Sequence, residues 1–287
     1  MLFRLKGIIF GLHGKEKVRY LCKNQRQALI MKRKYHYTIS LSDIGADYEI
    51  TINAVLGFFQ DAIARHMSSG YVASFDVRKK GMLWMINEFH ASLAEQRPFW
   101  SQEIDVEVFV SELSSVRVYV DFHMTDARGR LFSEGSSVWL LVEKESRRPV
   151  LTRSVPELVG LYDAAETVLH ERSLFPPEGE LIRSTVHPVT ATDIDFNGHV
   201  NNQSYVRLAV AMAPVEFLDS HIPCDMHVKF LQESFLGDTL ECRLSYGEGD
   251  SYVVRQIRQS DGKPVCQVVS RWLPAKAKAE IDKEIIR

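Results

Sequence analysis

An internal repeat with an offset of 150 residues is the feature that most constrains this chain. Ser42-Asp43-Ile44, a polar loop and an apolar run align without gaps with Thr192-Asp193-Ile194 and the run that follows it. Such a repeat sets the architecture, because each copy is expected to form the same supersecondary unit. At 287 residues, the chain has room for about two units of this kind.

Both copies continue into a segment with the apolar spacing of a helix. In the first copy a wide apolar stripe predicts a helix that is buried on most sides. The stripe consists of Ile52, Val55, Leu56, Phe58, Phe59, Ala62, Ile63 and Met67. In the second copy Tyr205, Leu208 and Met212 repeat the pattern as far as Pro214, which should kink or end the helix.

After each helix the pattern changes to runs of β-branched and aromatic residues, which are typical of strands. We expect strands over residues 104–110, 116–124 and 136–142, and over 226–231, 239–246, 252–259 and 265–273. The turns Asp126-Ala127-Arg128-Gly129 and Ser260-Asp261-Gly262-Lys263 fall at equivalent hairpin positions. The pattern predicts an α+β fold of two tandem hotdog domains, each a curved antiparallel sheet wrapped around a central helix. Joining the sheets edge to edge would cover their exposed edges.

Charge and composition divide the chain further. Residues 1–34 carry ten Lys and Arg residues against Glu16, which leaves an acidic remainder. We expect this basic extension to be disordered, or to lie upstream of a true start at Met31. An acidic body argues against a duplex nucleic-acid binder. The expected boundaries are 35–155 for the N-terminal hotdog, 156–182 for a linker, 183–275 for the C-terminal hotdog and 276–287 for a charged tail.

Several classes of protein are excluded by what the sequence lacks. It has no run of 18 apolar residues, so we expect no membrane span. Its four Cys residues form no C-x-x-C pair, which favours reduced thiols and a cytoplasmic protein over a disulfide scaffold or a zinc site. Without metal-ligand spacing or a Gly-rich phosphate loop, we expect neither a metal nor a cofactor.

The densest polar stretch runs from Asp195 to Asn202, directly ahead of the second helix. An extended or turning backbone here would project Asp195, Asn197 and His199 to one side. Thioester hydrolysis needs donors at a developing oxyanion and a base for water. The backbone amides of Gly198 and His199 are candidate donors, and Gly198 has no Cβ to block a substrate carbonyl.

The same residue types also make ordinary caps and turns, so the repeat is needed to weigh the two interpretations. At the equivalent positions the first copy has Gly45, Asp47 and Glu49. A set of acid, amide and imidazole in only one copy favours one active half and one half kept for binding.

The chain resembles the fatty acyl-acyl carrier protein thioesterases of plants and bacteria over about residues 35–274. The family motif D-x-N-x-H-V-N-N-x-x-Y is unbroken, as Asp195, Asn197, His199, Val200, Asn201, Asn202 and Tyr205. Ile44-Gly45-Ala46-Asp47, Leu83-Trp84 and residues 144–149 also resemble its N-terminal half. The resemblance implies hydrolysis of long-chain fatty acyl-acyl carrier protein, which releases free fatty acid and ends elongation in fatty acid biosynthesis.

The resemblance also implies a further catalytic Glu on a strand of the second copy, followed by a Cys. These positions are Glu233 and Ser234, so no thiol nucleophile is present here. We interpret Glu233 as the base or water-positioning group, His199 as its proton partner and Asp195 as the group that orients or shares that proton. Asn197 would bind the carbonyl or the water. Ser234 is more simply explained as a structural residue, because the chain has no G-x-S-x-G elbow.

Binding residues are predicted mainly in the first copy. Candidates for an acyl tunnel are Leu56, Phe59, Ile63, Trp84 and Met85, and candidates for carrier-protein docking are Arg78, Lys79 and Lys80. His66 and His90 have no matching acid partner in the sequence and are expected to be core or surface residues. An acyl-CoA thioesterase and a non-catalytic acyl-binding protein are the alternatives, and the polar set argues against the second. A homodimer is a further expectation.

Overall fold

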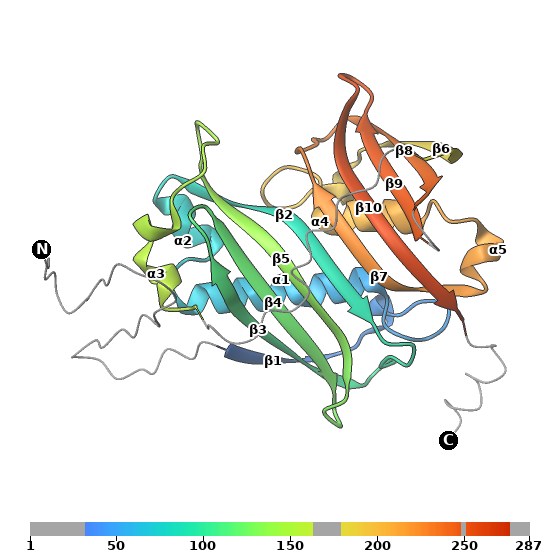
Figure 1. Cartoon of the computed structure of the whole chain (residues 1–287), viewed down its shortest axis with the longest axis horizontal. Helices are drawn as coiled ribbons and strands as arrows, with labels where there is room; N and C mark the ends of the chain where they lie inside the picture. The colour runs from blue at the N-terminus through green and yellow to red at the C-terminus, as the bar shows by residue number, and fades with distance from the viewer. Residues whose placement is uncertain (1–31, 163–178, 248–250, 276–287) are drawn as a thin grey trace, which may run out of the picture.

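The structure is a computed structural model that describes residues 32–162, 179–247 and 251–275 (Figure 1). Ten strands in these residues form one antiparallel sheet. The first half of the chain supplies β1 (Lys32–Thr38), β2 (Met82–Leu93), β3 (Glu103–Leu113), β4 (Arg117–Asp126) and β5 (Leu131–Glu143). The second half supplies β6 (Leu181–Pro188), β7 (His221–Phe230), β8 (Thr239–Tyr246), β9 (Ser251–Arg258) and β10 (Lys263–Pro274).

The strand order is symmetric about the pair formed by β2 and β7. It reads β1-β3-β4-β5-β2-β7-β10-β9-β8-β6, so each half contributes five neighbouring strands in the same relative order. At this seam Glu88 pairs with Lys229, and the register continues to Ser92 opposite Asp225. The inner edge strands of the two halves therefore cover one another, which leaves β1 and β6 as the outer edges.

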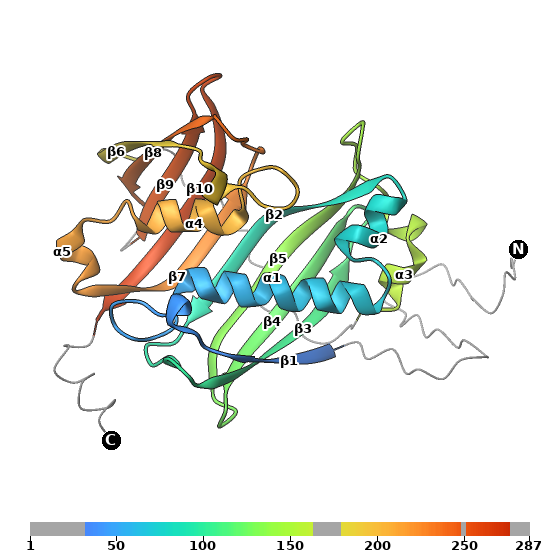
Figure 2. The same ribbon diagram turned by 180° about the vertical axis from the view of Figure 1, so that it is seen from behind.

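Two helices lie on the same face of this sheet, α1 (Ile52–Ser69) and α4 (Asn202–Val210) (Figure 2). Shorter helices are α2 (Ser74–Lys79), α3 (Pro156–Val159) and α5 (Val215–Leu218). Thr51 caps α1 by accepting a hydrogen bond from the Ala54 amide, and Asn201 caps α4 in the corresponding place. Both predicted helix starts are therefore confirmed.

The core of the first half forms around α1, because the apolar stripe faces the concave side of the sheet. The Phe59 ring lies 5.7 Å from that of Phe89 on β2 and 4.7 Å from that of Phe122 on β4. At the contact between the helices, Gln203 Nε2 donates to the Asn53 carbonyl at 3.0 Å. A Cβ at Gly57 would lie 2.4 Å from this nitrogen, so a larger residue there would displace the Gln203 side chain from this bond.

The expected strands and hairpins are all present, with Gly129 and Gly262 at positive φ in the two turns. Helix α4 ends at Val210, four residues before Pro214, which instead precedes α5. Strands β1 and β6 and the short helices α2, α3 and α5 were not among the expected elements. In β1 and β6 most positions are polar or exposed, so neither strand carries a strong apolar signal.

Strand β1 corrects one expected boundary. It begins at Lys32 and pairs with β3, so residues 32–34 belong to the sheet and not to the basic extension. The rest of that extension, most of the linker and the charged tail lie outside the described residues. None of the described helices is long and apolar enough to cross a membrane.

Candidate active site

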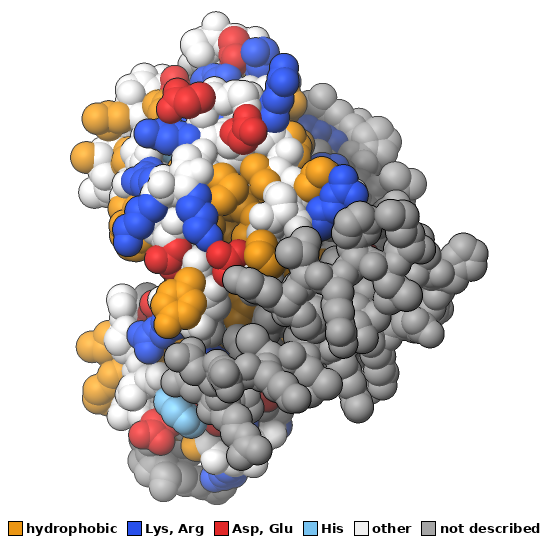
Figure 3. All heavy atoms as spheres, turned by 90° about the vertical axis from the view of Figure 1, so that its left-hand side faces the viewer, with side chains coloured by type: hydrophobic (Ala, Val, Ile, Leu, Met, Phe, Trp, Pro, Cys, Tyr) orange, Lys and Arg blue, Asp and Glu red, His pale blue; other side chains and the backbone are white. Residues whose placement is uncertain are grey.

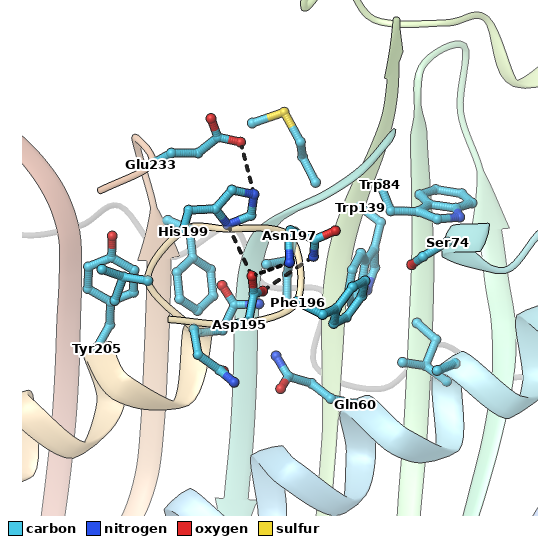
Figure 4. Close-up of a pocket in the computed structure, with 18 of the residues that line it drawn as sticks. Gln60, Ser74, Trp84, Trp139, Asp195, Phe196, Asn197, His199, Tyr205 and Glu233 are labelled. Carbon is cyan, nitrogen blue, oxygen red and sulfur yellow. Dashed lines mark hydrogen bonds and ion pairs between the residues drawn. The ribbon is translucent and has the colours of Figure 1, made fainter. Parts of the chain in front are cut away.

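A tight turn ahead of α4 carries the three polar side chains of the motif. The Asp195 amide donates to the His199 carbonyl at 2.9 Å, and Gly198 has a φ of 88°, which favours glycine. The carboxylate of Asp195 accepts from the Asn197 amide at 2.8 Å and from Asn197 Nδ2 at 3.3 Å. These bonds hold both side chains on the same side of the turn, beside the imidazole of His199 (Figure 4).

His199 lies between two carboxylates. Its Nδ1 is 3.8 Å from Asp195 Oδ1, and its Nε2 is 3.5 Å from Glu233 Oε1 (Figure 4). The Val200 amide donates to the Ser234 carbonyl at 2.8 Å, which fixes the Glu233 segment against the turn. The structure thus brings together all four residues that the sequence predicts as catalytic.

Glu233 was expected on a strand, but it lies in the loop that follows β7, which ends at Phe230. Its backbone carbonyl accepts a hydrogen bond from Arg258 Nη1 at 2.7 Å. Its side chain accepts from Arg147 Nη1 at 3.2 Å. Glu233 is therefore held by hydrogen bonds from two arginines and not by the backbone hydrogen bonds of a strand.

The expected role of the Gly198 amide needs correction. This N–H already donates to the Asp195 carbonyl at 3.0 Å within the turn, so it is not a free donor for an oxyanion. The His199 N–H has no hydrogen-bond partner among the described residues. It is the remaining backbone candidate for this role.

Ser234 is fully buried and does not line the cavity beside His199. This placement fits the structural role expected for it. Burial also raises the pKa of the neighbouring Tyr205 phenol, which therefore stays neutral. Neither hydroxyl is placed or ionised as a nucleophile would require.

The equivalent turn of the first half is closed by a buried arginine. Arg97 is only 3% exposed and donates to Asp47 at 2.6 Å, to Glu49 at 3.1 Å and to the Ile50 carbonyl at 3.0 Å. Asp47 and Glu49 occupy the positions of Asn197 and His199 in the 150-residue register. In this half the turn serves an ion pair, and Glu49 stands at the position of the imidazole.

A cavity of about 270 Å³ opens beside the turn that carries His199, between the two halves. Of the expected tunnel residues, Ile63, Trp84 and Met85 line it. Leu56 and Phe59 do not, because they are fully buried core residues under the sheet. Apolar lining residues that the sequence interpretation missed are Met67, Trp139, Tyr205 and Phe230. The apolar pattern could not separate them from core residues.

A second hollow of about 200 Å³ adjoins the first and shares Phe196, His199 and Glu233 with it; we call this second hollow the entrance. The exposed rings of Phe75 on α2 and Phe196 in the catalytic turn lie 5.7 Å apart across it. Basic residues lining this entrance are Arg78, Lys144 and Arg147. All three belong to the first half, whereas Phe196, His199 and Glu233 come from the second, so both halves of the chain frame the entrance.

The three docking candidates are placed differently. Arg78 Nη2 donates to Asn197 Oδ1 at 3.4 Å and lines the entrance. Lys79 is exposed on α2. Lys80 is paired with Glu157 at 2.7 Å, which also lowers the pKa of that carboxyl. Lys80 is therefore a weak docking candidate.

The two other histidines have clear places in the fold. His66 is fully buried in α1, and burial lowers its pKa to about 4, so it is a neutral core residue as expected. His90 does have an acid partner, contrary to expectation, because Nε2 lies 3.0 Å from Asp225 Oδ2 across the β2–β7 seam. That partner comes from the other half of the chain and is invisible to sequence spacing.

Sequence profiles of known families match most of the described chain. The Acyl-ACP thioesterase N-terminal domain matches residues 31–161, and the Acyl-ACP thioesterase C-terminal domain matches residues 180–274. The chain belongs to the acyl-ACP thioesterase family. A large antiparallel sheet with few helices fits the hotdog-like fold of acyl-ACP thioesterase structures.

Similar proteins and structures are distant in sequence. A palmitoyl-acyl carrier protein thioesterase of Gossypium hirsutum is 22% identical, covering 88% of this chain and 66% of its own length. The FATB1 acyl-[acyl-carrier-protein] hydrolase of Cuphea viscosissima is also 22% identical, covering 85% of this chain and 62% of its own. The chain thus spans slightly under two thirds of the length of these relatives.

Solved structures agree with the fold over nearly their whole length. The 12:0-ACP thioesterase from Umbellularia californica aligns with a TM-score of 0.75 and 19% identity, covering 92% of this chain and all of that one. An acyl-ACP thioesterase from Bacteroides thetaiotaomicron also gives 0.75, at 16% identity, with 85% and 98% covered. These likenesses support the fold of this acyl-ACP thioesterase family member.

Proposed function

We propose that this chain hydrolyses the thioester of long-chain fatty acyl-acyl carrier protein, releasing free fatty acid and ending chain elongation. The observation that carries the proposal is the placement of His199 between Asp195 and Glu233, at the edge of an apolar cavity. An imidazole between two carboxylates can accept and return a proton, and an apolar cavity can hold an alkyl chain. Family membership supports the same activity.

The geometry supports hydrolysis by water without a covalent intermediate. Glu233 and His199 would hold a water beside the thioester carbonyl, and His199 Nε2 would take its proton as the oxygen attacks. The tetrahedral oxyanion would be stabilised by the His199 backbone N–H and by other donors at the turn. Collapse of the intermediate breaks the C–S bond, and the imidazolium returns the proton to the leaving sulfur. The products are a fatty acid and a free thiol.

Asp195 and Asn197 would act around this imidazole. Asp195 Oδ1 lies on the Nδ1 side of the ring, where it can orient the imidazole and stabilise its charged form. Asn197 lines both hollows. Its side-chain Nδ2 donates a hydrogen bond to Asp195, and its Oδ1 accepts one from Arg78. We infer that it orders the turn and contributes to binding of the carbonyl or the water.

The acyl chain would occupy the cavity between the halves. Helix α1 and strand β2 of the first half contribute Ile63, Met67, Trp84 and Met85 to its apolar wall. Burial of an alkyl chain stabilises the complex by roughly 0.8 kcal/mol for each methylene. This division of labour supports two fused hotdog modules, an N-terminal module at about residues 35–155 for acyl binding and a C-terminal catalytic module at about 183–275. The symmetric strand order supports the same duplication.

The carrier protein would dock at the entrance. On the molecular face of Figure 3, Lys and Arg side chains lie next to hydrophobic ones, with Asp and Glu among them. Apart from Arg147, which is bonded to Glu233, the basic residues of the first half at or near the entrance are Arg78, Lys79 and Lys144. A local basic patch on an otherwise acidic body would attract an acidic partner.

Two finer assignments belong to the same proposal. We place the protein in the cytosol, supported by the free thiols of Cys224, Cys242 and Cys266, whereas its plant relatives are named as chloroplastic. A homodimer remains a prediction that light scattering after size exclusion would test.

A thiol-release assay tests the proposal directly. Purified chain is given palmitoyl-acyl carrier protein and palmitoyl-CoA side by side, with His199→Ala as the control for contaminating esterases. We expect a higher kcat/KM with the carrier protein than with CoA. Equal efficiency on both would make the chain a general acyl thioesterase, and binding of either without thiol release would make it an acyl-binding protein.

A further inference from the structure

Arg147 is a residue of the non-catalytic half that reaches the catalytic carboxylate. It lies in the loop that follows β5, and its Nη1 donates to Glu233 Oε1 at 3.2 Å. The same oxygen lies 3.5 Å from His199 Nε2. The guanidinium and the imidazole thus converge on a single oxygen atom from two different halves of the chain.

The backbone of Arg147 is in a conformation that residues with a Cβ rarely adopt. Its φ is 57°, in the left-handed region where glycine is usual. The Arg147 amide donates to the Glu143 carbonyl at 2.9 Å, and the Glu143 amide donates to the Arg148 carbonyl at 2.9 Å. Ser146 Oγ donates to Glu143 Oε2 at 2.6 Å and accepts from the Arg148 amide at 3.2 Å. These bonds hold the unfavourable conformation in place.

Retention of an arginine where glycine would relieve strain points to a role for the side chain. Strained residues of this kind cluster at functional sites, where the surrounding structure holds them. Arg147 also lines the entrance together with His199 and Glu233. The turn therefore delivers a long cationic side chain to the place where the catalytic carboxylate lies.

Glu233 needs such a partner, because its own backbone does not fix its side chain. It lies in a loop, and the bond from Arg258 holds only its carbonyl. A carboxylate with free side-chain torsions would turn toward solvent, and its 23% exposed side chain has room to do so. A charge-assisted bond from Arg147 to Oε1 removes that freedom and keeps this oxygen next to His199.

We propose that Arg147 is a positioning residue that holds the Glu233 carboxylate toward His199, so that the first half completes the active site of the second. This inference rests on the proposed thioesterase function. It assigns Arg147 to the reacting groups, and not to the surface that attracts the carrier protein. Because misplacement of a reacting group by about 1 Å can cost roughly 100-fold in rate, the expected effect is on kcat.

The test uses two substrates, palmitoyl-acyl carrier protein and the palmitoyl thioester of N-acetylcysteamine, which has neither a charge nor a phosphate. Arg147→Ala should lower kcat by about 10- to 100-fold on both, with little change in KM. Arg147→Lys keeps a cation and should recover part of the rate. Arg148→Ala is the matched control, because Arg148 is exposed in the same loop and does not line the entrance.

Two further variants separate positioning from folding. Arg147→Gly relieves the left-handed strain, so it should melt at the same temperature as the wild type or higher while losing as much kcat as Arg147→Ala. In a Glu233→Gln background, Arg147→Ala should lower kcat no further, because the group it positions is already disabled.

The outcomes discriminate clearly. A loss confined to the carrier-protein substrate and expressed in KM would make Arg147 a docking residue and overturn the proposal. If Arg147→Ala lowers kcat in the Glu233→Gln background by as much as it does in the wild type, the proposal is also overturned. A wild-type chain that hydrolyses neither substrate would overturn the proposed function itself, whereas an active wild type with an unimpaired Arg147→Ala variant would overturn only the role of Arg147.

Discussion

At the scale of single residues, the imidazole of His199 has a carboxylate near each of its two ring nitrogens. Asp195 lies on the Nδ1 side and Glu233 on the Nε2 side, at 3.8 Å and 3.5 Å. Both distances are longer than a hydrogen bond, as is common in catalytic sites without substrate. A bound water or a substrate carbonyl can form hydrogen bonds that link these groups.

The first prediction concerns these groups. His199→Ala and Glu233→Gln should each lower kcat by roughly 100-fold or more, because each removes a group that handles the proton of the attacking water. Thiol release from palmitoyl-acyl carrier protein measures the effect, and circular dichroism checks that both variants fold. Near wild-type turnover in either variant would refute the site assignment.

Ser234 gives the contrasting prediction. Its side chain is fully buried and does not line the cavity. Ser234→Ala should therefore leave kcat within about threefold of the wild type, since the change removes no group that touches substrate. A loss as large as that of His199→Ala would instead indicate an acyl-serine intermediate, which trapping of a labelled acyl group would detect.

At the scale of elements, the same turn is used for different purposes ahead of α1 and α4. Gly45 donates to the Glu49 carbonyl as Asp195 donates to that of His199, each at 2.9 Å. Tyr48 has a φ of 63° where Gly198 has 88°. One backbone shape therefore carries an ion pair around Arg97 in the first half and the side chains of Asp195, Asn197 and His199 in the second.

Glu49→Ala tests this division. The change removes one carboxylate from buried Arg97, which keeps Asp47 and the Ile50 carbonyl as partners. We expect a loss of about 1–3 kcal/mol in the free energy of unfolding, because a buried charge loses a partner. Denaturant titration measures that loss, and kcat should stay close to the wild-type value. A large fall in kcat would mean that the first half also has an active site.

Helix α1 has a pH dependence that follows from His66. Neither of its ring nitrogens has a hydrogen-bond partner among the described residues, and burial lowers its pKa to about 4 from 6.5. Between these pH values the unfolded chain binds a proton that the folded chain does not, so stability falls as the pH drops from 6.5 to 4. The full effect is about 3 kcal/mol.

The measurement is the free energy of unfolding across this pH range in wild type and in His66→Leu. The variant should lose less stability on acidification, because it has no imidazole to protonate. Carboxylates with lowered pKa values, such as Asp193 and Asp225, contribute in the same direction in both chains, so the difference isolates His66. Equal slopes would show that His66 is protonated in the folded state.

At the scale of the whole molecule, the two halves share one sheet, one cavity and one entrance. The seam is formed by β2 and β7, and side-chain contacts cross it between His90 and Asp225 and between His227 and Glu88. The cavity has lining residues from both halves. The cavity is therefore built jointly by the two halves that meet at this seam.

Carrier-protein docking is predicted to be electrostatic. Lys79→Glu combined with Lys144→Glu should raise KM for palmitoyl-acyl carrier protein by about 10-fold, with little change for the neutral N-acetylcysteamine thioester. Added salt should raise the wild-type KM in the same direction, because exposed charges are screened. The matched control is Arg128→Glu. Arg128 is exposed and lies before the start of β5, whereas Lys144 lies just after the end of the same strand. Equal effects on both substrates would refute a docking role.

The sequence alone determined the parts of this protein that depend on local pattern. The 150-residue register, both helix starts, the two glycine turns and the set of Asp195, Asn197, His199 and Glu233 are encoded in neighbouring residues or in a motif. Periodicity and turn chemistry act over a few residues, so they can be read without knowing the fold.

Only the tertiary structure decided which distant groups meet. Arg97 closes the first turn, Arg147 reaches Glu233, and His90 finds Asp225, through contacts between segments separated by 48, 86 and 135 residues. It also separated Ile63, Trp84 and Met85, which line the cavity, from Leu56 and Phe59, which fill the core. An apolar side chain has the same pattern in either place, because the sheet's curvature and the packing of the two halves decide where space remains.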